Sequence, residues 1–522
     1  MPFQHWPMVG KVQIRLKRSG TCVLELSIHA QRIALQITAA ALLTLLASCG
    51  GSDSSAPSPV PTAPGPTPSA TPTPSPTPSG SVTSQLSING AQLGQTVTGW
   101  EVTPRFWEFD KDNDRYDPTW LSQKAEIARA AVELGGINRI RVELRSGLEN
   151  PTDYWTPFTQ NKIGYNAVRD HFYEKINDNG SPTSANAAGF QWWAFDYYIE
   201  NFVLPLKSEL AKKGLGLYVN LCFVDFNWTP LKGNLSVSRN ADEYAEIMTL
   251  GALRLRDKYG IAPDSVEIIL EPDNGDGWSG ANIGRAALAL KQRLAAAGLT
   301  PKVIAPSTSR ATVVLDFLNS LETVPGASGA IDTISYHRYD GNSADGAIDG
   351  IRQRASAYGA QTAMLEYVNG DIGNFFTDMT FGGGNAWQAY GVVDAASTES
   401  AAKDGYVLWR SPSGELALTA QFARIAAIQR EVLPGARAIF TARQSGSDKI
   451  IAFRNPDGSE VVAVFSPQGS MADIAGLTHG AYHLTIVNKG STTSTTATLS
   501  ANGSGHAQVK VPAEAVAVLR SI

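Results

Sequence analysis

Two short runs of the sequence end in a glutamate, and they carry the clearest chemical signal in the chain. Residues 265–270 form an apolar run that stops at Glu271, and residues 361–365 form a second run that stops at Glu366. An apolar run that ends in a carboxylate is typical of a buried strand whose last residue enters a site. Two carboxyl groups at the same ends of parallel strands can serve as proton donor and nucleophile, the pair that hydrolyses glycosidic bonds.

A third stretch, residues 137–145, predicts a strand with one charged face. Apolar side chains at 140, 142 and 144 alternate with Arg139, Arg141, Glu143 and Arg145. Successive side chains of a strand point to opposite faces, so the four charged groups share one face. A charged face on a central strand is unfavourable unless it lines a polar cavity, which is what we expect here. An edge strand with a solvated face is the alternative.

Strand and helix patterns alternate between residues 97 and 432, which predicts an α/β fold. Strand patterns fall at residues 97–102, 137–145, 215–225, 265–271, 302–307, 331–339, 361–366 and 405–409. Helical patterns fall at residues 119–134, 192–213, 241–259, 281–297, 312–321 and 347–358, near Trp387, and at 416–432. These units predict a (β/α)8 TIM barrel, with Glu271 at the end of strand four and Glu366 at the end of strand seven, on the face that carries active sites.

The periodicity changes after residue 435. Short alternating runs predict strands at residues 438–443, 449–454, 461–466, 482–487, 497–499, 508–511 and 516–519. The turn Asn455-Pro456-Asp457-Gly458 predicts a hairpin between two of them. We therefore expect a catalytic barrel at residues 84–435 and a small β-sandwich at residues 436–522.

The first part of the chain predicts an export signal and a spacer. An apolar run at residues 33–46 is short for a membrane span and ends in Leu46-Ala47-Ser48-Cys49. This tetrapeptide resembles a bacterial lipobox, which implies cleavage before Cys49 and lipidation of its thiol. Residues 52–80 are almost wholly Ser, Pro, Thr, Ala and Gly, the composition of an extended spacer.

We accordingly expect a lipoprotein signal at residues 1–49 and a linker at residues 50–83. The expected location is the bacterial cell envelope, with a lipid anchor in the outer membrane or at the cell surface. An ordinary secretory signal, and with it a secreted protein, is the alternative.

Composition argues against several classes of function. The chain has 43 basic and 48 acidic residues, a net charge of −5 at pH 7, and no basic cluster, which argues against nucleic-acid binding. Cys22, Cys49 and Cys222 lack the spacing of metal ligands. No zinc-protease, nucleophile-elbow or phosphate-loop motif occurs. We expect no metal, no cofactor, and a monomer that meets the membrane only through its lipid anchor.

Four stretches resemble the clan A retaining glycoside hydrolases, and within that clan most closely glycoside hydrolase family thirty. Leu270-Glu271-Pro272 is similar to the clan's Asn-Glu-Pro, and Met364-Leu365-Glu366 falls at the nucleophile strand. Residues 335–339, Ser-Tyr-His-Arg-Tyr, resemble a His-x-Tyr on strand six, and residues 422–436 resemble the junction between barrel and sandwich. The resemblance covers about residues 95–522, and it implies that residues 84–96 add a strand to the sandwich.

The resemblance also implies roles for five residues. Glu271 would be the acid/base and Glu366 the nucleophile. Arg141 matches the strand-two arginine that the clan places under the nucleophile, where it would keep Glu366 ionised. Tyr339 would donate to Glu366, and His337 would belong to the site; a core tyrosine and an interior histidine with satisfied nitrogens are the alternatives.

One position departs from the clan. Leu270 replaces the asparagine that binds the sugar 2-hydroxyl, so another donor is expected. Asn220, Asp225 and Asn274 are the candidates for this substrate contact. Trp409, at the end of the last predicted strand, could stack on a sugar ring.

Together these observations predict a retaining glycoside hydrolase. It would cleave O-glycosidic bonds of an extracellular polysaccharide or glycoconjugate, such as a β-glucan or xylan, by double displacement. The rival hypothesis is a surface lipoprotein that binds glycan through a catalytically decayed barrel. A separation near 5 Å between the two carboxyl groups would favour the enzyme, and side chains that point apart would favour the binder.

Overall fold

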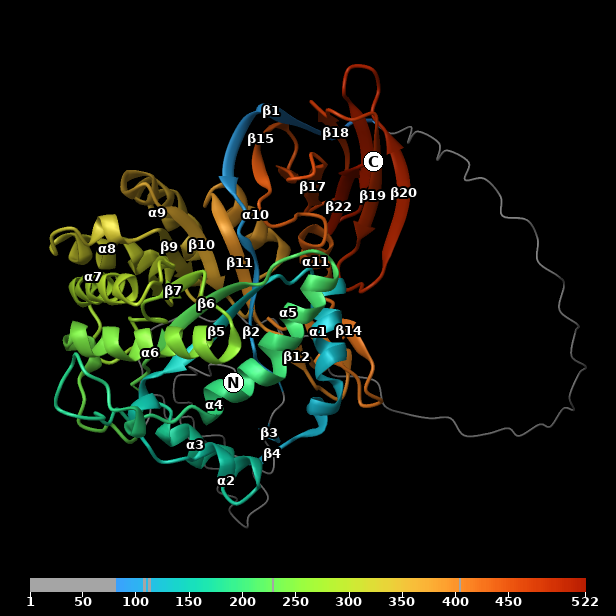
Figure 1. The fold of residues 1–522 in the computed structure, drawn as a ribbon. Coiled ribbons are helices and arrows are strands. Elements are labelled where there is room, and N and C mark those ends of the chain that lie inside the picture. Colours follow the sequence, from blue (N-terminus) through green and yellow to red (C-terminus); the bar gives the residue numbers. More distant parts are fainter. Residues whose placement is uncertain (1–80, 107–108, 111–113, 228–229, 403–404) are drawn as a thin grey trace, which may run out of the picture. The chain divides into compact units, whose positions relative to one another are not determined.

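Eight parallel strands close into a barrel, as the sequence predicts (Figure 1). The computed structural model describes residues 81–106, 109–110, 114–227, 230–402 and 405–522. Around the barrel the strands follow one another in chain order, and the last pairs with the first. They are β2 (Gly99–Thr103), β5 (Arg139–Arg145), β6 (Tyr218–Val224), β7 (Ser265–Glu267), β8 (Lys302–Thr308), β9 (Thr333–His337), β10 (Gln361–Glu366) and β11 (Gly384–Gly391).

Helices connect the strands on the outside of the barrel, and α6 to α9 lie side by side there (Figure 1). α6 begins where the Asn240 side chain accepts a hydrogen bond from the Glu243 N–H, and it ends at Gly260, whose φ of +63° suits a glycine. The helices are α1 (Lys124–Glu133), α2 (Trp155–Thr159), α3 (Tyr165–His171), α4 (Trp193–Tyr198), α5 (Leu204–Lys212), α6 (Ala241–Tyr259), α7 (Gly280–Ala296), α8 (Val314–Glu322), α9 (Asp345–Tyr358), α10 (Ile372–Thr380) and α11 (Ala423–Gln429).

The predicted end of the barrel is wrong in three places. The eighth barrel strand is β11, not residues 405–409, and Trp387 lies in β11 and not in a helix. Residues 408–410 form β13 (Leu408–Arg410), which pairs with β12 (Val393–Asp394) and β14 (Leu416–Leu418) in a separate small sheet. The helix predicted at residues 416–432 is only α11, and α10 is a helix that the sequence patterns did not predict.

A second sheet of nine strands contains the C-terminal part of the chain. Its order is β20-β19-β22-β17-β16-β15-β1-β18-β21. The strands are β1 (Ser84–Thr96), β15 (Arg437–Ser445), β16 (Lys449–Arg454), β17 (Glu460–Ser466), β18 (Ser470–Ala475), β19 (Ala481–Val487), β20 (Ser494–Ser500), β21 (Ala507–Val511) and β22 (Ala515–Ser521). Tyr482 of β19 and Val509 of β21, near opposite ends of the sheet, share one core, so the sheet folds over on itself.

β1 belongs to this sheet and not to the barrel, although it precedes the first barrel strand. It pairs antiparallel with β15 and parallel with β18, and Leu86 and Ile88 enter the core. The barrel therefore begins at β2. β18 is a further strand that the sequence patterns did not predict.

The signal, the lipobox with Cys49 and the spacer up to residue 80 lie outside the described residues. Within the described part of the chain, no helix combines the length and apolar character needed to cross a membrane.

Candidate active site

The barrel places Glu271 and Glu366 at the same end, although β8 and β9 lie between the strands that they follow or end. Glu366 is the last residue of β10, and the following residue, Tyr367, donates its N–H to the carbonyl of Ala389 in β11 (2.9 Å). Glu271 lies four residues beyond β7, where its N–H donates to the carbonyl of Ser307 in β8 (2.9 Å). Both side chains therefore stand at the carboxyl ends of the strands, the catalytic face of such barrels.

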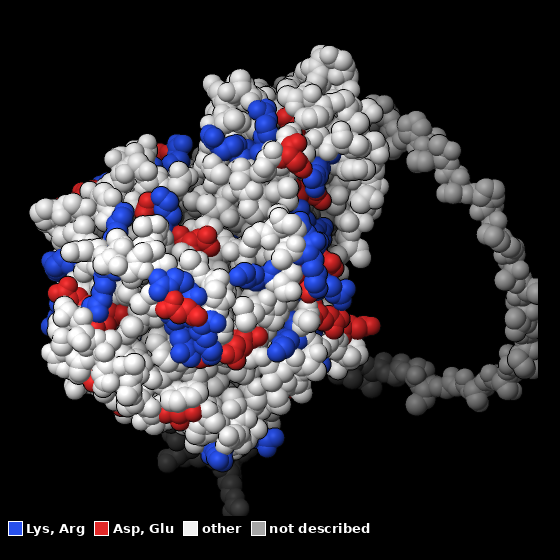
Figure 2. All heavy atoms as spheres, in the orientation of Figure 1, with Lys and Arg blue, Asp and Glu red and all other residues white. Residues whose placement is uncertain are grey.

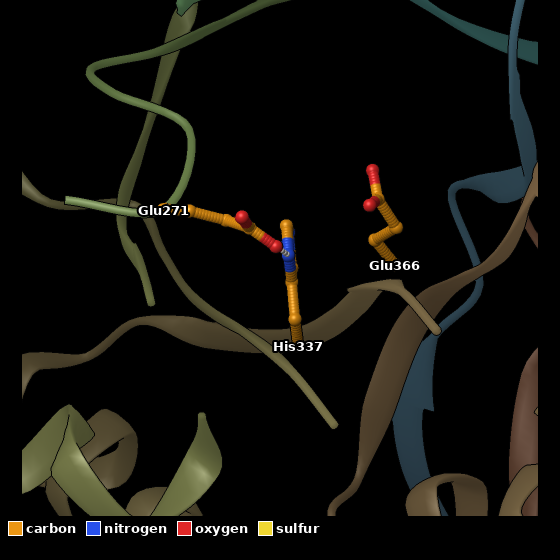
Figure 3. A group of neighbouring side chains, drawn as sticks. All are labelled: Glu271, His337 and Glu366. Carbon is orange, nitrogen blue, oxygen red and sulfur yellow. Dashed lines mark hydrogen bonds and ion pairs between the residues drawn. The ribbon is translucent and has the colours of Figure 1, made fainter. Parts of the chain in front are cut away.

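The two carboxyl groups lie close together. One oxygen of Glu271, one oxygen of Glu366 and a ring nitrogen of His337 all lie within 4.8 Å of one another. Figure 3 shows the Glu271 side chain reaching toward the His337 ring, with Glu366 rising from the opposite side. This separation is near the 5 to 5.5 Å of retaining glycosidases and well below the 6.5 to 9.5 Å of inverting ones.

Glu366 is held by two donors. Arg141 of β5 donates from Nη2 to Oε2 of Glu366 and from Nη1 to the carbonyl of Leu365 (3.1 Å). The Tyr339 hydroxyl donates to Oε1 of Glu366 (2.7 Å). Burial alone would lower the pKa of Arg141, but the nearby charges of Glu366 and Glu267 raise it well above its usual range. A permanent cation and a hydroxyl donor stabilise a carboxylate in its ionised form.

Glu271 has different surroundings. His337 Nδ1 and Glu271 Oε1 share a hydrogen bond of 2.9 Å, and Asn274 donates its Nδ2–H to Oε2 (3.0 Å). Glu271 has a φ of +49°, a left-handed conformation that is unfavourable for a residue with a side chain. Such strain is typical of positions that a fold holds for a function, and here it aims a carboxyl group at the barrel mouth.

Burial raises the pKa of Glu271, and the negative charge of Glu366 raises it further, against the opposing hydrogen bond from His337. Burial alone lowers the pKa of His337, but its contacts with Glu271 and Glu366 raise it. Both shifts favour the protonated form of the Glu271–His337 pair. A retained proton is what a general acid needs.

The turn after Glu271 is fixed by Asp273. Its carboxylate accepts hydrogen bonds from the Ser309 N–H (2.7 Å) and hydroxyl (2.6 Å), across the loop that follows β8. Asn274 donates its N–H to the carbonyl of Glu271 (2.8 Å), which closes the turn. These bonds position Asn274, which alone among the three predicted replacements for the clan asparagine contacts Glu271.

Asn220 and Asp225 do not reach the glutamate pair. Asn220 is buried in the barrel at the level of Ser265, donates to Glu267 (2.8 Å) and accepts from the Ser265 hydroxyl (2.9 Å). Asp225 is buried at the end of β6, where it accepts from Ser146, Lys175 and Trp278. Both side chains use their hydrogen-bonding groups inside the protein, so neither fits the predicted substrate contact.

Trp409 is not on a barrel strand. It belongs to β13, is half-buried, and donates its indole N–H to the carbonyl of Ala396 (2.9 Å). The stacking role was predicted because residues 405–409 were expected to form the eighth barrel strand, and that strand assignment is wrong.

One charged group near the site was not predicted from the sequence. Arg105, just after β2, donates to Glu143 of β5 (2.6 Å), and both line a hollow with Arg145, Tyr154 and His171 at the carboxyl ends of these strands. Burial would raise the pKa of Glu143, but the neighbouring arginines lower it. Glu143 and Arg145 could be recognised from the charged face of their strand, whereas nothing in the sequence marks Arg105.

The Glu271, His337 and Glu366 group has the composition of a metal site. Five of its six possible donor atoms are already engaged by protein groups, and His337 Nε2 is buried without a hydrogen-bond partner. His337 bonds Glu271, and both oxygens of Glu366 accept from Arg141 and Tyr339. A guanidinium in direct contact with a ligand carboxylate disfavours a second cation there. The arrangement therefore suits proton transfer and nucleophilic attack better than metal binding.

Solved structures share this fold at low sequence identity. The catalytic domain of GH30 xylanase C from Talaromyces cellulolyticus has a TM-score of 0.58 and 14% identity, over 84% of this chain and 99% of that one. A GH30 endoxylanase from Clostridium papyrosolvens C71 gives 0.57 and 14%, over 84% and 100%. An endo-beta1,6-glucanase gives 0.55 and 15%, over 85% and 94%. No family model and no curated protein sequence matches the chain.

Proposed function

We propose that this protein is a retaining glycoside hydrolase of the family-thirty type, with Glu271 as acid/base and Glu366 as nucleophile. The observation that carries the proposal is the pair of carboxyl groups within 4.8 Å of each other at the carboxyl end of a closed barrel. The different surroundings of the two groups support the division of roles, because burial raises the pKa of Glu271 whereas Glu366 faces a guanidinium.

In the first step the ionised Glu366 attacks the anomeric carbon. A carbon–oxygen bond forms to Glu366 as the glycosidic bond breaks, and the Glu271 proton passes to the departing oxygen. Arg141 and Tyr339 hold the attacking carboxylate in place, and they also stabilise it as a leaving group in the next step.

In the second step Glu271, now ionised, takes a proton from a water molecule. The water oxygen attacks the anomeric carbon on the face from which the first leaving group departed, and the ester bond to Glu366 breaks. Glu366 leaves as a carboxylate and Glu271 is protonated again, so one water is consumed and the sugar configuration is retained. Asn274 supports Glu271 in both states because it donates to Oε2.

We propose an extracellular polysaccharide as substrate, with xylans and β-glucans as first candidates. The proteins of similar fold include two that are described as xylanases and one as a beta1,6-glucanase. On the face in Figure 2, acidic and basic side chains are interspersed without an extended patch of one sign, as suits a glycan of low charge better than a polyanion. The lipobox at Cys49 and the proline-rich spacer support a lipid anchor in the bacterial envelope, which extends the same proposal.

The test is to incubate the purified protein with xylans, β-1,3-, β-1,4- and β-1,6-glucans and aryl glycosides, and to follow new reducing ends. Glu271→Gln and Glu366→Gln are the test variants. Glu200→Gln, which changes an exposed carboxylate on the outside of the barrel, is the matched control. We expect release from at least one substrate, reduced by three or more orders of magnitude in both test variants and unchanged in the control.

Two results would contradict the proposal. Full activity in Glu366→Gln would exclude this residue as the nucleophile. Binding of a glycan without release by the unmodified protein would favour the rival hypothesis of a glycan-binding lipoprotein, which the replacement of the clan asparagine by Leu270 motivates.

A further inference from the structure

A second group of carboxylates lies on the connections around strands β5 and β6 and shares no residue with the proposed active site. Glu149 ends a short 3-10 turn, η2 (Ser146–Glu149), directly after β5. Asp178 lies in the connection between α3 and α4, and Glu243 and Glu246 lie on the first turns of α6. One oxygen of each of these four residues lies within 4.8 Å of the others.

Three of the four side chains are fully buried, and each of these three has at least one oxygen without a hydrogen-bond partner. Glu149 and Glu246 are 0% exposed and Glu243 is 1% exposed. Five oxygens accept no hydrogen bond: both of Glu149, Oδ1 of Asp178, Oε1 of Glu243 and Oε2 of Glu246. A buried carboxylate without a donor or a cation is strongly unfavourable. Glu149 is the clearest case because both of its oxygens lack a partner although it points into the cluster.

Other contacts hold the remaining oxygens on the outside of the cluster. Asp178 accepts from Asn179 Nδ2 (3.0 Å) and from the Asn186 N–H through Oδ2. Glu246 Oε1 accepts from Arg293 (2.7 Å). Among the described residues, Arg293 is the one cationic side chain within 4 Å of these carboxylates. Four acidic groups therefore face a single positive charge.

We propose that Glu149, Asp178, Glu243 and Glu246 bind a calcium ion. Calcium takes six to eight oxygen ligands at about 2.3 to 2.6 Å, so ligands on opposite sides of the ion lie about 4.6 to 5.2 Å apart. The four carboxylates match that span with one oxygen each, and second carboxylate oxygens or water would complete the shell. Zinc prefers nitrogen and sulfur ligands, and magnesium keeps most of its water, so neither suits a buried cage of carboxylates.

The concentration of negative charge in the cluster also supports a bound cation. Burial raises the pKa of Glu149 to about 9, and the nearby Glu243, Asp178 and Glu246 carboxylates raise it in the same direction. Carboxyl groups in such surroundings either hold protons or share a cation. The convergence of four of them from three separate segments favours the cation.

The ion would tie three segments together: η2, the connection that carries Asp178, and α6. Arg293 of α7 holds the same connection, because it also donates to the carbonyls of Pro182 (2.9 Å) and Thr183 (3.2 Å). Lys175, which lies earlier in this connection, bonds Asp225 at the end of β6 (2.9 Å). Calcium should therefore stabilise the long segment between β5 and β6, independently of whether the proposed hydrolase activity exists.

The experiment compares thermal unfolding of the purified protein in EDTA and in Ca2+, with isothermal titration of Ca2+ into the EDTA-treated, desalted protein. At a free Ca2+ concentration one hundred times the Kd, linkage predicts a rise in Tm of about 3 °C for a chain of this size. Titration should give one saturable site. Proteolysis within residues 176–186 should be slower with Ca2+ than with EDTA.

Two conservative variants and a neighbouring control test the assignment. Glu149→Gln and Glu243→Gln should lose both the Tm response and the titration heat, while their Tm in EDTA stays near or above that of the unmodified protein because a buried negative charge is removed. Asp242→Asn changes an exposed carboxylate in the same turn of α6 and should keep the full response.

A protein with no saturable Ca2+ heat and no Tm response would overturn the proposal and leave a cluster of carboxyl groups that share protons. A response that persists in Glu149→Gln and Glu243→Gln would also overturn it, because the ion would then bind elsewhere. Equal stabilisation by Mg2+ would refute the assignment to calcium.

Discussion

At the scale of single residues, Glu271 and Glu366 have the same side chain but different proposed roles, because their neighbours differ. Glu366 accepts hydrogen bonds from the guanidinium of Arg141 and the hydroxyl of Tyr339. Glu271 lies beside a histidine and an amide, without an arginine, and burial raises its pKa. The proposed division into nucleophile and acid follows from these contacts.

The Tyr339 hydroxyl gives the first prediction. Tyr339→Phe removes one hydrogen bond to a charged carboxylate, a contact that contributes about 1.5 to 3 kcal/mol. We expect kcat/KM to fall about 10- to 100-fold with little change in Tm, measured by steady-state kinetics and thermal unfolding. Tyr367→Phe is the control, because the Tyr367 ring packs edge-on against that of Tyr339 with the ring centroids 5.9 Å apart. Its kcat/KM should stay near that of the unmodified protein. Equal losses in both variants would mean that the effect is one of packing.

The raised pKa of Glu271 gives the second prediction. Because Glu366 raises that pKa, Glu366→Gln should lower it, so that Glu271 loses its proton at a lower pH than in the unmodified protein. Carbon-13 NMR titration of the glutamate carboxyl signals measures the change, with Glu271→Gln used to assign the resonance. In the active protein the same shift means that activity persists above the usual pKa of a glutamate and falls as pH rises through the raised value. An unchanged Glu271 titration in Glu366→Gln would show that the two groups do not interact.

At the scale of elements, the turn after β7 determines where Glu271 points. Glu271 is held at a φ of +49°, and Asp273 fastens the turn to Ser309 through two hydrogen bonds. The strain is tolerated because both ends of the turn are bonded. Catalysis should therefore depend on Asp273 although this residue does not contact the Glu271 carboxyl group.

Asp273→Ala tests that dependence. We expect kcat to fall about 10- to 100-fold, because misplacement of a catalytic group by about 1 Å has effects of this size, and stability to fall by about 1 to 3 kcal/mol. Kinetics and urea unfolding measure the two effects. Asp276→Ala, which removes a carboxylate that is 49% exposed in the same loop, is the control and should have a smaller effect on kcat. A normal kcat in Asp273→Ala would show that Glu271 keeps its position without the turn.

The sequence predicted seven of the barrel strands because their apolar periodicity is clear. The eighth strand, β11, was not predicted. Some of its side chains are polar and form their hydrogen bonds only in the folded barrel. The Trp387 N–H donates to Asp378 (3.0 Å), and the Gln388 amide lies 2.8 Å from the Thr103 hydroxyl. Apolar periodicity reveals a buried strand only when its buried side chains are apolar. A strand whose buried polar groups are hydrogen-bonded to distant residues therefore lacks a clear strand pattern in the sequence.

Glu271 and Glu366 were predictable because an apolar strand pattern ends at each of them. His337 and Tyr339 were expected from the resemblance to family thirty, and they contact Glu271 and Glu366 respectively. Asn220 and Asp225 share one strand pattern, but the sequence does not show that Glu267 and Lys175 occupy their polar groups. The four carboxylates of the proposed calcium site come from three segments far apart in the chain, so no local motif announces them.

At the scale of the whole molecule, the N-terminal strand β1 completes a sheet that otherwise forms from the last part of the chain. It lies between β15 and β18, so without it both neighbours lose a hydrogen-bonding partner. Leu86 and Ile88 of β1 are buried in the core of that sheet. Residues 84–96 are therefore as much a part of the C-terminal domain as residues 437–522.

Removal of β1 tests this organisation. A protein that begins at Val97 should be less soluble than one that begins at Ser81. Its sheet, which has lost β1, should unfold at a lower temperature than the complete nine-stranded sheet. Soluble yield and calorimetry of the two proteins make the comparison. Addition of a peptide that spans residues 81–96 to the shortened protein should restore part of the stability. Equal melting of the two proteins would show that β1 is dispensable.

The most direct test of the central claim is the configuration of the first product. Proton NMR in the first minutes of hydrolysis, before mutarotation, follows the anomeric signal released from whichever substrate the reducing-end assay identifies. A separation of 4.8 Å or less between carboxylate oxygens predicts that the new reducing end first appears with the configuration of the bond that was cleaved. A first product of inverted configuration would contradict the account, because the water would then have attacked without a covalent intermediate on Glu366.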